Sequence, residues 1–170
     1  MKKMLLLLLI TMLALVGCQK KEPLTFKDKL CVLVSHADES CQIAYHFDAE
    51  VPLVFYENDQ KDLMVAILND AGNKALEITG APQLFKQIED GELFTWHGSE
   101  VTDQSVALIY GLADDSVQSV VVESEGNIQA NRIRIDGDLS LWYVANKDGQ
   151  LTMPIKVKAY GEGGNIIGES

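Results

Sequence analysis

From Gln42 to the C-terminus the chain is a succession of short apolar runs separated by turn-forming residues. Runs of this length, rich in Val, Ile, Leu and aromatic residues, are typical of β-strands. We therefore predict a mainly β protein of α+β class, in which the C-terminal half is β-sandwich-like. The expected strands are residues 43–47, 52–57, 63–69, 74–79, 93–96, 105–112, 117–123, 129–135, 139–145, 154–160 and 165–168.

The pattern of apolar residues within a run indicates how many of its faces are covered. Ile133 and Ile135 alternate with Arg132 and Arg134, and residues 155–159 alternate in the same way, so each of these strands is expected to have one wet face. Residues 106–110 and 120–122 are apolar on both faces, which is typical of central strands covered on each side.

Three stretches have the composition of hairpin turns. They are Asn69-Asp70-Ala71-Gly72-Asn73, Asn146-Lys147-Asp148-Gly149 and Gly161-Glu162-Gly163-Gly164. Asn, Asp and Gly tolerate the left-handed backbone that reverses a strand.

A short helix is expected near the start of the folded part. Thr25-Phe26-Lys27-Asp28 has the form of a capping box, and apolar residues follow at helical spacing, although residues 30–34 could equally form a strand. We divide the folded part into an N-terminal α+β portion, residues 25–98, and a C-terminal β-sandwich-like portion, residues 99–170. The boundary is placed in the polar stretch 97–103.

The N-terminus has the features of a lipoprotein signal peptide. Lys2 and Lys3 precede a long aliphatic run, and Leu15-Val16-Gly17-Cys18 closes it as a lipobox. The run is too short for an ordinary membrane-spanning helix. The resemblance to bacterial lipoprotein signals implies that residues 1–17 are removed, that Cys18 is lipidated, and that residues 18–24 are a tether between the membrane and the fold.

The mature chain is strongly acidic. The full sequence has 14 basic and 25 acidic residues, and removal of residues 1–17 takes away two lysines and no acidic residue, which leaves a formal charge near −13. We expect no nucleic-acid partner, because phosphates repel such a chain. We also expect the lipid anchor, rather than charge, to hold the protein at the membrane.

Cys31 and Cys41 are expected to form a disulfide, since thiols outside the cytoplasm tend to oxidise. A bridge that closes so short a loop would stabilise the fold by roughly 2 to 3 kcal/mol. The alternative is two separate buried thiols.

No catalytic motif is present in the sequence. It contains no Gly-x-Ser-x-Gly, and the three histidines, His36, His46 and His97, do not have metal-site spacing. We assign no catalytic residue, no metal site and no cofactor. The numerous carboxylates are scattered, so acid and base chemistry on sugars would require the fold to bring two of them together.

Four basic residues lie on the wet faces of two expected strands: Arg132, Arg134, Lys156 and Lys158. If these strands are neighbours, the four side chains form a basic strip that could bind an anion such as wall polymer or lipid phosphate. The alternative is a wet sheet face whose bases pair with nearby acids.

The order of Val54-Phe55-Tyr56-Glu57, Ile109-Tyr110-Gly111, Leu141-Trp142-Tyr143-Val144 and the segment 155–165 resembles small lipoproteins of Bacillus-like Gram-positive bacteria that have no assigned activity. The resemblance implies an anchored, largely β protein on the extracytoplasmic face of the cell membrane.

From this we expect a non-enzymatic binding or interaction module of the cell envelope. Its partner would be an envelope protein or an anionic wall polymer. One alternative is a wall-polymer hydrolase or transferase that uses carboxylates, which a cleft holding two close acids would favour. Another is an accessory or inhibitory partner of a membrane protein, which would dock through an exposed strand or an apolar patch.

Overall fold

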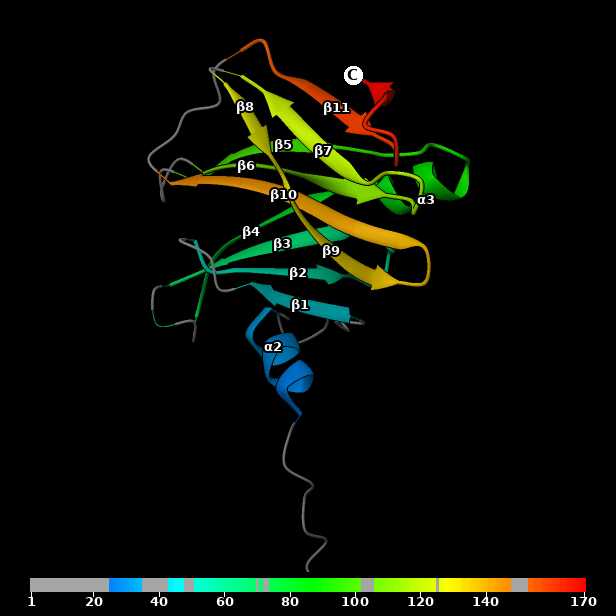
Figure 1. Cartoon of the computed structure of the whole chain (residues 1–170). Coiled ribbons are helices and arrows are strands. Elements are labelled where there is room, and N and C mark those ends of the chain that lie inside the picture. The colour runs from blue at the N-terminus through cyan, green and yellow to red at the C-terminus, as the bar shows by residue number, and fades with distance from the viewer. Residues whose placement is uncertain are drawn as a thin grey trace, which may run out of the picture.

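The computed structural model describes residues 25–34, 43–47, 51–69, 71, 74–101, 106–124, 126–147 and 153–170. Three four-stranded antiparallel sheets are stacked as layers, and a helix lies against the first of them (Figure 1). The prediction of a mainly β chain is confirmed. No helix within the described ranges is both long and apolar enough to span a bilayer.

Sheet A is a simple meander in which each strand pairs with the next. It contains β1 (Ile43–Phe47), β2 (Leu53–Glu57), β3 (Leu63–Leu68) and β4 (Ala75–Ala81). Helix α2 (Phe26–Val34) lies on its outer face, where Val34 packs against a cluster of side chains from β2 and β3. Thr25 and Asp28 form a capping box at the start of α2, in which the Asp28 amide donates to Thr25 Oγ1 at 3.1 Å and the Thr25 amide donates to Asp28 Oδ2 at 2.9 Å.

Sheet B is the middle layer, and helix α3 (Leu84–Glu89) leads into it from sheet A. The sheet has the order β5, β6, β10, β9, with β5 (His97–Val101), β6 (Val106–Ala113), β9 (Asn131–Asp136) and β10 (Leu139–Lys147). All residues of β6 are buried, which confirms the prediction of a strand covered on both faces.

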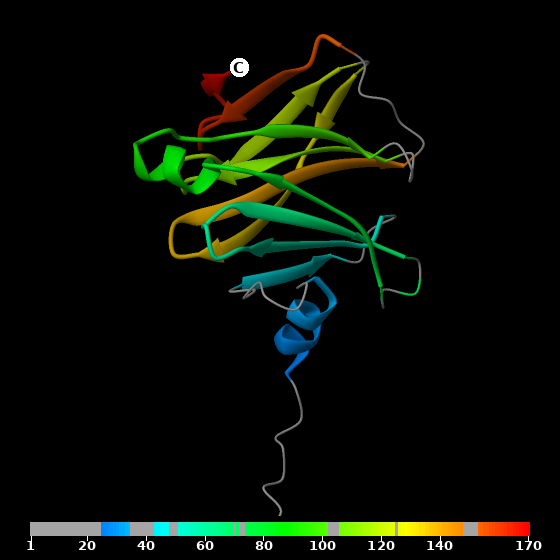
Figure 2. The ribbon, with the colours of Figure 1, turned by 180° about the vertical axis from the view of Figure 1, so that it is seen from behind.

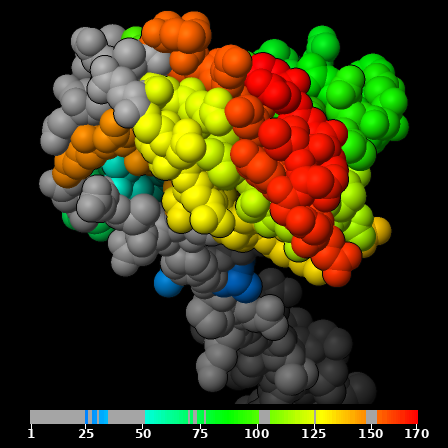
Figure 3. All heavy atoms as spheres, turned by 45° about the horizontal axis from the view of Figure 1, so that its top comes forward, coloured from blue at the N-terminus to red at the C-terminus, as the bar shows by residue number. Residues whose placement is uncertain are grey.

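Sheet C forms the outer layer at the end opposite α2 (Figure 2). It has the order β12, β11, β7, β8, with β7 (Ser119–Glu123), β8 (Asn127–Gln129), β11 (Lys156–Tyr160) and β12 (Ile166–Glu169). Its strands lie side by side as an uncovered surface in Figure 3.

Alternate residues of sheet B supply two separate cores. Leu108, Tyr110 and Leu112 pack toward sheet A, where they meet Leu53 and Phe55. On the opposite face, a second cluster joins sheets B and C: Ile109, Ala113, Val117, Val120, Val122, Trp142, Val144, Val157 and Ala159. Sheets B and C therefore form the expected sandwich, and sheet A adds a third β layer to it.

The structure corrects two sequence expectations in sheets B and C. Residues of β7 alternate between buried and half-buried positions, so this strand has one wet face and is not covered on both. Its outer face carries Val121, and this apolar residue is the reason that the sequence pattern predicted two covered faces.

The turn expected at Asn146-Lys147-Asp148-Gly149 does not join paired strands, because β10 belongs to sheet B and the next strand, β11, belongs to sheet C. Residues 148–149 lie outside the described ranges.

The polar stretch 97–103, where the sequence predicts a domain boundary, contains strand β5, which pairs with β6 at the edge of sheet B. An edge strand needs backbone hydrogen bonds on one side only and tolerates polar side chains, so residues 97–101 lack an apolar pattern. The boundary predicted between residues 98 and 99 falls within this strand. The strand expected at 93–96 is reduced to a single bridge between Phe94 and Ala113.

Candidate functional site: an apolar pocket between sheets A and B

A pocket of about 200 Å³ opens between sheets A and B, at the end where α3 packs. An apolar cavity of roughly 150 Å³ is enough to hold a benzene ring. The pocket therefore has room for one small apolar group. Its described lining is Tyr56, Glu57, Leu63, Phe85, Ile135, Asp136, Leu139 and Leu141.

The wall from sheet A is formed where β2 turns into β3. Glu57 and Leu63 are cross-strand partners at this turn. The Asn58 side chain closes the turn, because its Oδ1 accepts hydrogen bonds at 2.9 Å from the amides of Gln60 and Asp62. The ends of β2 and β3 are thus fixed by local chemistry that the sequence contains.

The opposite wall is the hairpin between β9 and β10 of sheet B. Asp136 and Leu139 are partners across a two-residue turn, and Gly137 takes a left-handed φ of 43° within it. Arg134 Nε donates to the Gly137 carbonyl at 2.7 Å and braces the hairpin from outside. The side chains of Ile135 and Leu139 from this hairpin line the pocket.

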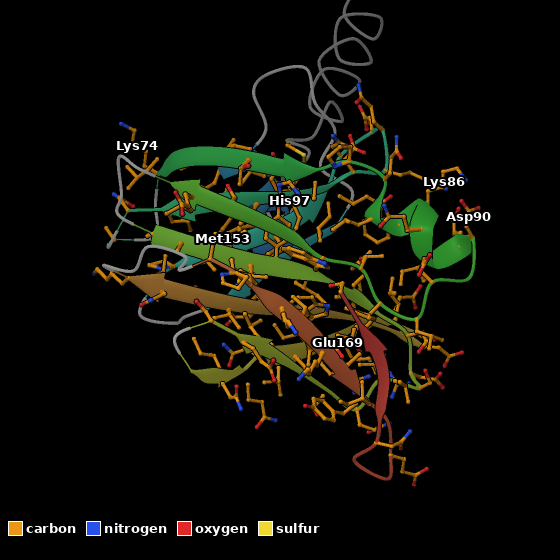
Figure 4. All side chains as sticks on the ribbon, turned by 90° about the horizontal axis from the view of Figure 1, so that it is seen from above. Lys74, Lys86, Asp90, His97, Met153 and Glu169 are labelled. Atoms are coloured by element: carbon orange, nitrogen blue, oxygen red, sulfur yellow. The ribbon has the colours of Figure 1, made fainter. Side chains whose placement is uncertain are left out.

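Helix α3 closes one side of the pocket with Phe85. The residue before the helix, Gln83, donates its amide to Asp62 Oδ1 at 3.3 Å, which ties the helix start to the β2–β3 turn. Lys86 of α3 pairs at 2.5 Å with Asp90, the residue that follows the helix, on the exposed side of the helix (Figure 4).

Glu57 and Asp136 are the acidic groups of the described lining, and they come from the two opposing sheets. Glu57 is half-buried, whereas Asp136 is exposed. Neither carboxylate takes part in an ion pair or a side-chain hydrogen bond with another residue that the structure describes. The pocket therefore combines apolar walls with two negative charges that the described part of the chain leaves unneutralised.

The four basic residues expected to form a strip are divided between two sheets. Arg132 and Arg134 lie on β9 in sheet B, whereas Lys156 and Lys158 lie on β11 in sheet C. Strands β9 and β11 are not neighbours, so the condition for a single strip is not met.

The two arginines do line one open hollow, together with Asp115, Gln118 and Ser140. Arg132 already donates to the Gln118 carbonyl at 3.2 Å, and Arg134 braces the β9–β10 turn. The carboxylate of Asp115 offsets part of the positive charge in this hollow.

The two lysines pair with acids across sheet C. Lys158 Nζ lies 2.7 Å from Glu123 Oε1, and Lys156 Nζ lies 3.7 Å from Glu169 Oε1. The hydrogen bond to Glu123 raises the pKa of Lys158. This is the arrangement of the alternative interpretation, in which bases on a wet face pair with neighbouring acids.

A second, more polar groove of about 430 Å³ runs along the edge strand β5. Its lining includes His97, Glu100 and Met153, and Figure 4 shows His97 and Met153 in this region. The His97 ring lies edge-on to Tyr110, with ring centroids 5.6 Å apart, and burial lowers the pKa of His97. Strand β5 is the terminal strand of sheet B, which is the position that strand addition requires, but nothing in the lining of this groove selects a particular partner.

Among the remaining predicted residues, Cys31 is disulfide-bonded, whereas Cys18 and Cys41 lie outside the described ranges. The pairing of Cys31 with Cys41 stays a prediction. His36 also lies outside these ranges, and His46 is placed only as a backbone position in β1. Within the described part of the chain, no group of three His, Cys, Asp or Glu side chains could hold a metal ion.

Sequence reasoning missed the pocket because Glu57 and Asp136 lie far apart along the chain. The expected strands did place Glu57 at the end of strand 52–57 and Asp136 between strands 129–135 and 139–145. Only the packing of sheet A on sheet B brings these two positions to one opening.

Comparisons with known proteins give no family to which the chain can be assigned: no family model, curated protein or solved structure matches it.

Proposed function

We propose that this protein is a lipid-anchored binding protein of the extracytoplasmic face of the cell membrane, and that it holds a small ligand by an apolar group in the pocket between sheets A and B. The observation that supports this proposal is the pocket itself, which has apolar walls from two sheets and α3. Binding sites are typically concave and mostly apolar, with a few polar groups that orient the ligand.

The lining favours an apolar ligand over a sugar. A site for wall polymer needs hydrogen-bonding partners for many hydroxyl groups, and catalysis on sugars needs two carboxylates placed across the scissile bond. The described pocket does contain two carboxylates, but its other side chains are Leu, Ile, Phe and Tyr. Its volume of about 200 Å³ suits one small group rather than a stretch of polymer.

The lipobox indicates which end of the folded protein is tethered to the membrane. The tether of residues 18–24 spans at most about 25 Å when extended. In this proposal the start of helix α2 lies within that distance of the membrane, and sheet C lies at the other end of the stack from α2 (Figure 1). The pocket lies between these ends, on the side of the stack, where a ligand outside the cell can reach it.

Replacement of the lipobox cysteine tests the anchor. In a Bacillus-like Gram-positive host, the wild-type chain is expected to incorporate labelled palmitate and to fractionate with membranes. The reason is that the proposed lipidation attaches a diacylglycerol to Cys18, and two acyl chains hold a protein stably at a bilayer. Cys18→Ala should abolish the label and release the protein. Cys41→Ala is the matched control and should keep the label. An unlabelled wild-type chain, or a labelled Cys18→Ala chain, would contradict the anchor.

Binding of a neutral aromatic probe tests the pocket. A ring that buries on the order of 150 Å² gains about 4 kcal/mol at ~25 cal/mol per Å², which corresponds to a Kd of about 1 mM. We expect benzyl alcohol to give saturable methyl shifts in a ¹³C NMR titration, confined to Leu63, Ile135, Leu139 and Leu141. Leu139→Trp should fill the pocket and weaken binding more than about tenfold.

The control for this substitution is Ile128→Trp, at a 42% exposed position on β8 that does not line the pocket. It should bind benzyl alcohol as the wild type does. Circular dichroism and thermal unfolding verify that both variants are folded. Shifts that do not saturate, or that persist in folded Leu139→Trp, would overturn the assignment of the pocket.

A further inference from the structure

The two carboxylates at the pocket define the class of ligand more narrowly. We propose that the natural ligand carries a positive charge beside its apolar group, as a small primary ammonium with an aromatic or alkyl tail does. This inference rests on the proposed function. The tail would occupy the apolar pocket, and the ammonium would lie between Glu57 and Asp136.

The positions of Glu57 and Asp136 in the pocket support a cationic ligand. Glu57 belongs to sheet A and is the cross-strand partner of Leu63, whereas Asp136 belongs to sheet B and is the partner of Leu139. Each carboxylate is thus attached next to an apolar residue of the pocket wall, one on each side. A ligand whose tail contacts both walls would bring its head group near both charges.

Two basic side chains next to residues of the pocket lining, Arg134 beside Ile135 and Lys86 beside Phe85, are engaged elsewhere. Arg134 of the β9–β10 hairpin donates to the Gly137 carbonyl and lies 3.8 Å from Asp138. Lys86 of α3 is paired with Asp90. Neither provides a counter-ion that an ammonium would have to displace from Glu57 or Asp136.

The expected gain is modest because the acids are partly solvated. Charges near a protein surface interact through a high effective dielectric, and exposed ion pairs contribute little individually. We expect roughly a threefold gain in affinity from each carboxylate, or about tenfold for the pair at low salt. The preference should shrink as salt is added, because ions screen exposed charges.

Three probes with the same ring test this proposal in the full-length folded chain: benzylammonium, benzyl alcohol and benzoate. In the NMR titration at low salt, benzylammonium should bind about tenfold more tightly than benzyl alcohol, and benzoate should bind least tightly. The Glu57→Gln/Asp136→Asn variant should lose most of the ratio between benzylammonium and benzyl alcohol. Asp138→Asn, which removes a charge from the same hairpin but not from the pocket lining, should keep the ratio.

The outcomes separate this inference from the proposed function. Equal binding of benzylammonium and benzyl alcohol would overturn the cationic ligand and leave the apolar pocket intact. Absence of binding by all three probes would overturn the proposed function itself. A tenfold preference that survives in the folded double variant would show that the cation is recognised elsewhere, and this would also overturn the inference.

Discussion

Gly111→Ala is expected to destabilise the protein by about 3 to 5 kcal/mol, although it adds a single methyl group. A Cβ at Gly111 would lie 1.9 Å from the Thr95 carbonyl oxygen and 2.7 Å from its carbonyl carbon. These are backbone atoms, so the segment around Thr95 would have to move. That movement would break the hydrogen bond from the Thr95 amide to the Leu112 carbonyl (2.8 Å) and the one from the Leu112 amide to Thr95 Oγ1 (3.1 Å).

The same substitution at Gly126 provides the control. Nothing lies within 4 Å of a Cβ built there, and its φ is not in the left-handed region. Gly126→Ala should therefore be neutral or stabilise by up to about 1 kcal/mol, because alanine restricts the unfolded chain. Urea unfolding followed by far-UV circular dichroism measures both variants. Equal midpoints for the two variants would refute the close contact over Gly111.

Trp142→Ala is expected to cost about 3 to 5 kcal/mol of unfolding free energy. Trp142 has no exposed surface and belongs to the core between sheets B and C. Its indole Nε1 donates to the Leu112 carbonyl at 3.3 Å, the same oxygen that accepts the Thr95 amide. The truncation would leave a large cavity and remove one of these two donors.

A graded series tests the cause of this loss. Trp142→Phe retains a large ring but removes the donor, so it should cost roughly 1 to 3 kcal/mol. Leu76→Ala, at a side chain that is 42% exposed, should change stability by less than about 0.5 kcal/mol. Urea midpoints at constant m-value give the ranking. A Trp142→Ala midpoint close to that of Leu76→Ala would contradict the role of Trp142 in this core.

Thr95 also explains why one expected strand is missing. Residues 93–96 have strand composition, and Phe94 does bridge to Ala113. At the next position the Thr95 hydroxyl, rather than a backbone carbonyl, accepts the Leu112 amide, while the Thr95 carbonyl lies over Gly111. The regular ladder then resumes at His97. A side chain that competes with the backbone for a hydrogen bond is not visible as a break in an apolar pattern.

Two turns show how far local sequence signals can predict strand pairing. Gly161-Glu162-Gly163-Gly164 joins β11 to β12 as predicted, with a hydrogen bond from the Gly161 amide to the Asn165 carbonyl and with Gly164 at φ 72°. Asn146-Lys147-Asp148-Gly149 has equally good turn composition, yet the strands on its two sides belong to different sheets. Turn chemistry is local, whereas the choice of pairing partner depends on the whole fold.

The mainly β character of the chain can be predicted from the amino-acid sequence alone, because the length of apolar runs, their alternation and the composition of turns act within a few residues. The same is true of β6, which is covered on both faces, and of β11, which has one wet face. Three other features follow only from the packing of the whole chain: the stacking of three sheets, the separation of Arg132 and Arg134 from Lys156 and Lys158, and the presence of Glu57 and Asp136 in the lining of one pocket. These features depend on contacts between residues far apart in the chain, and a local pattern specifies which face of a strand is apolar but not which sheet will cover it.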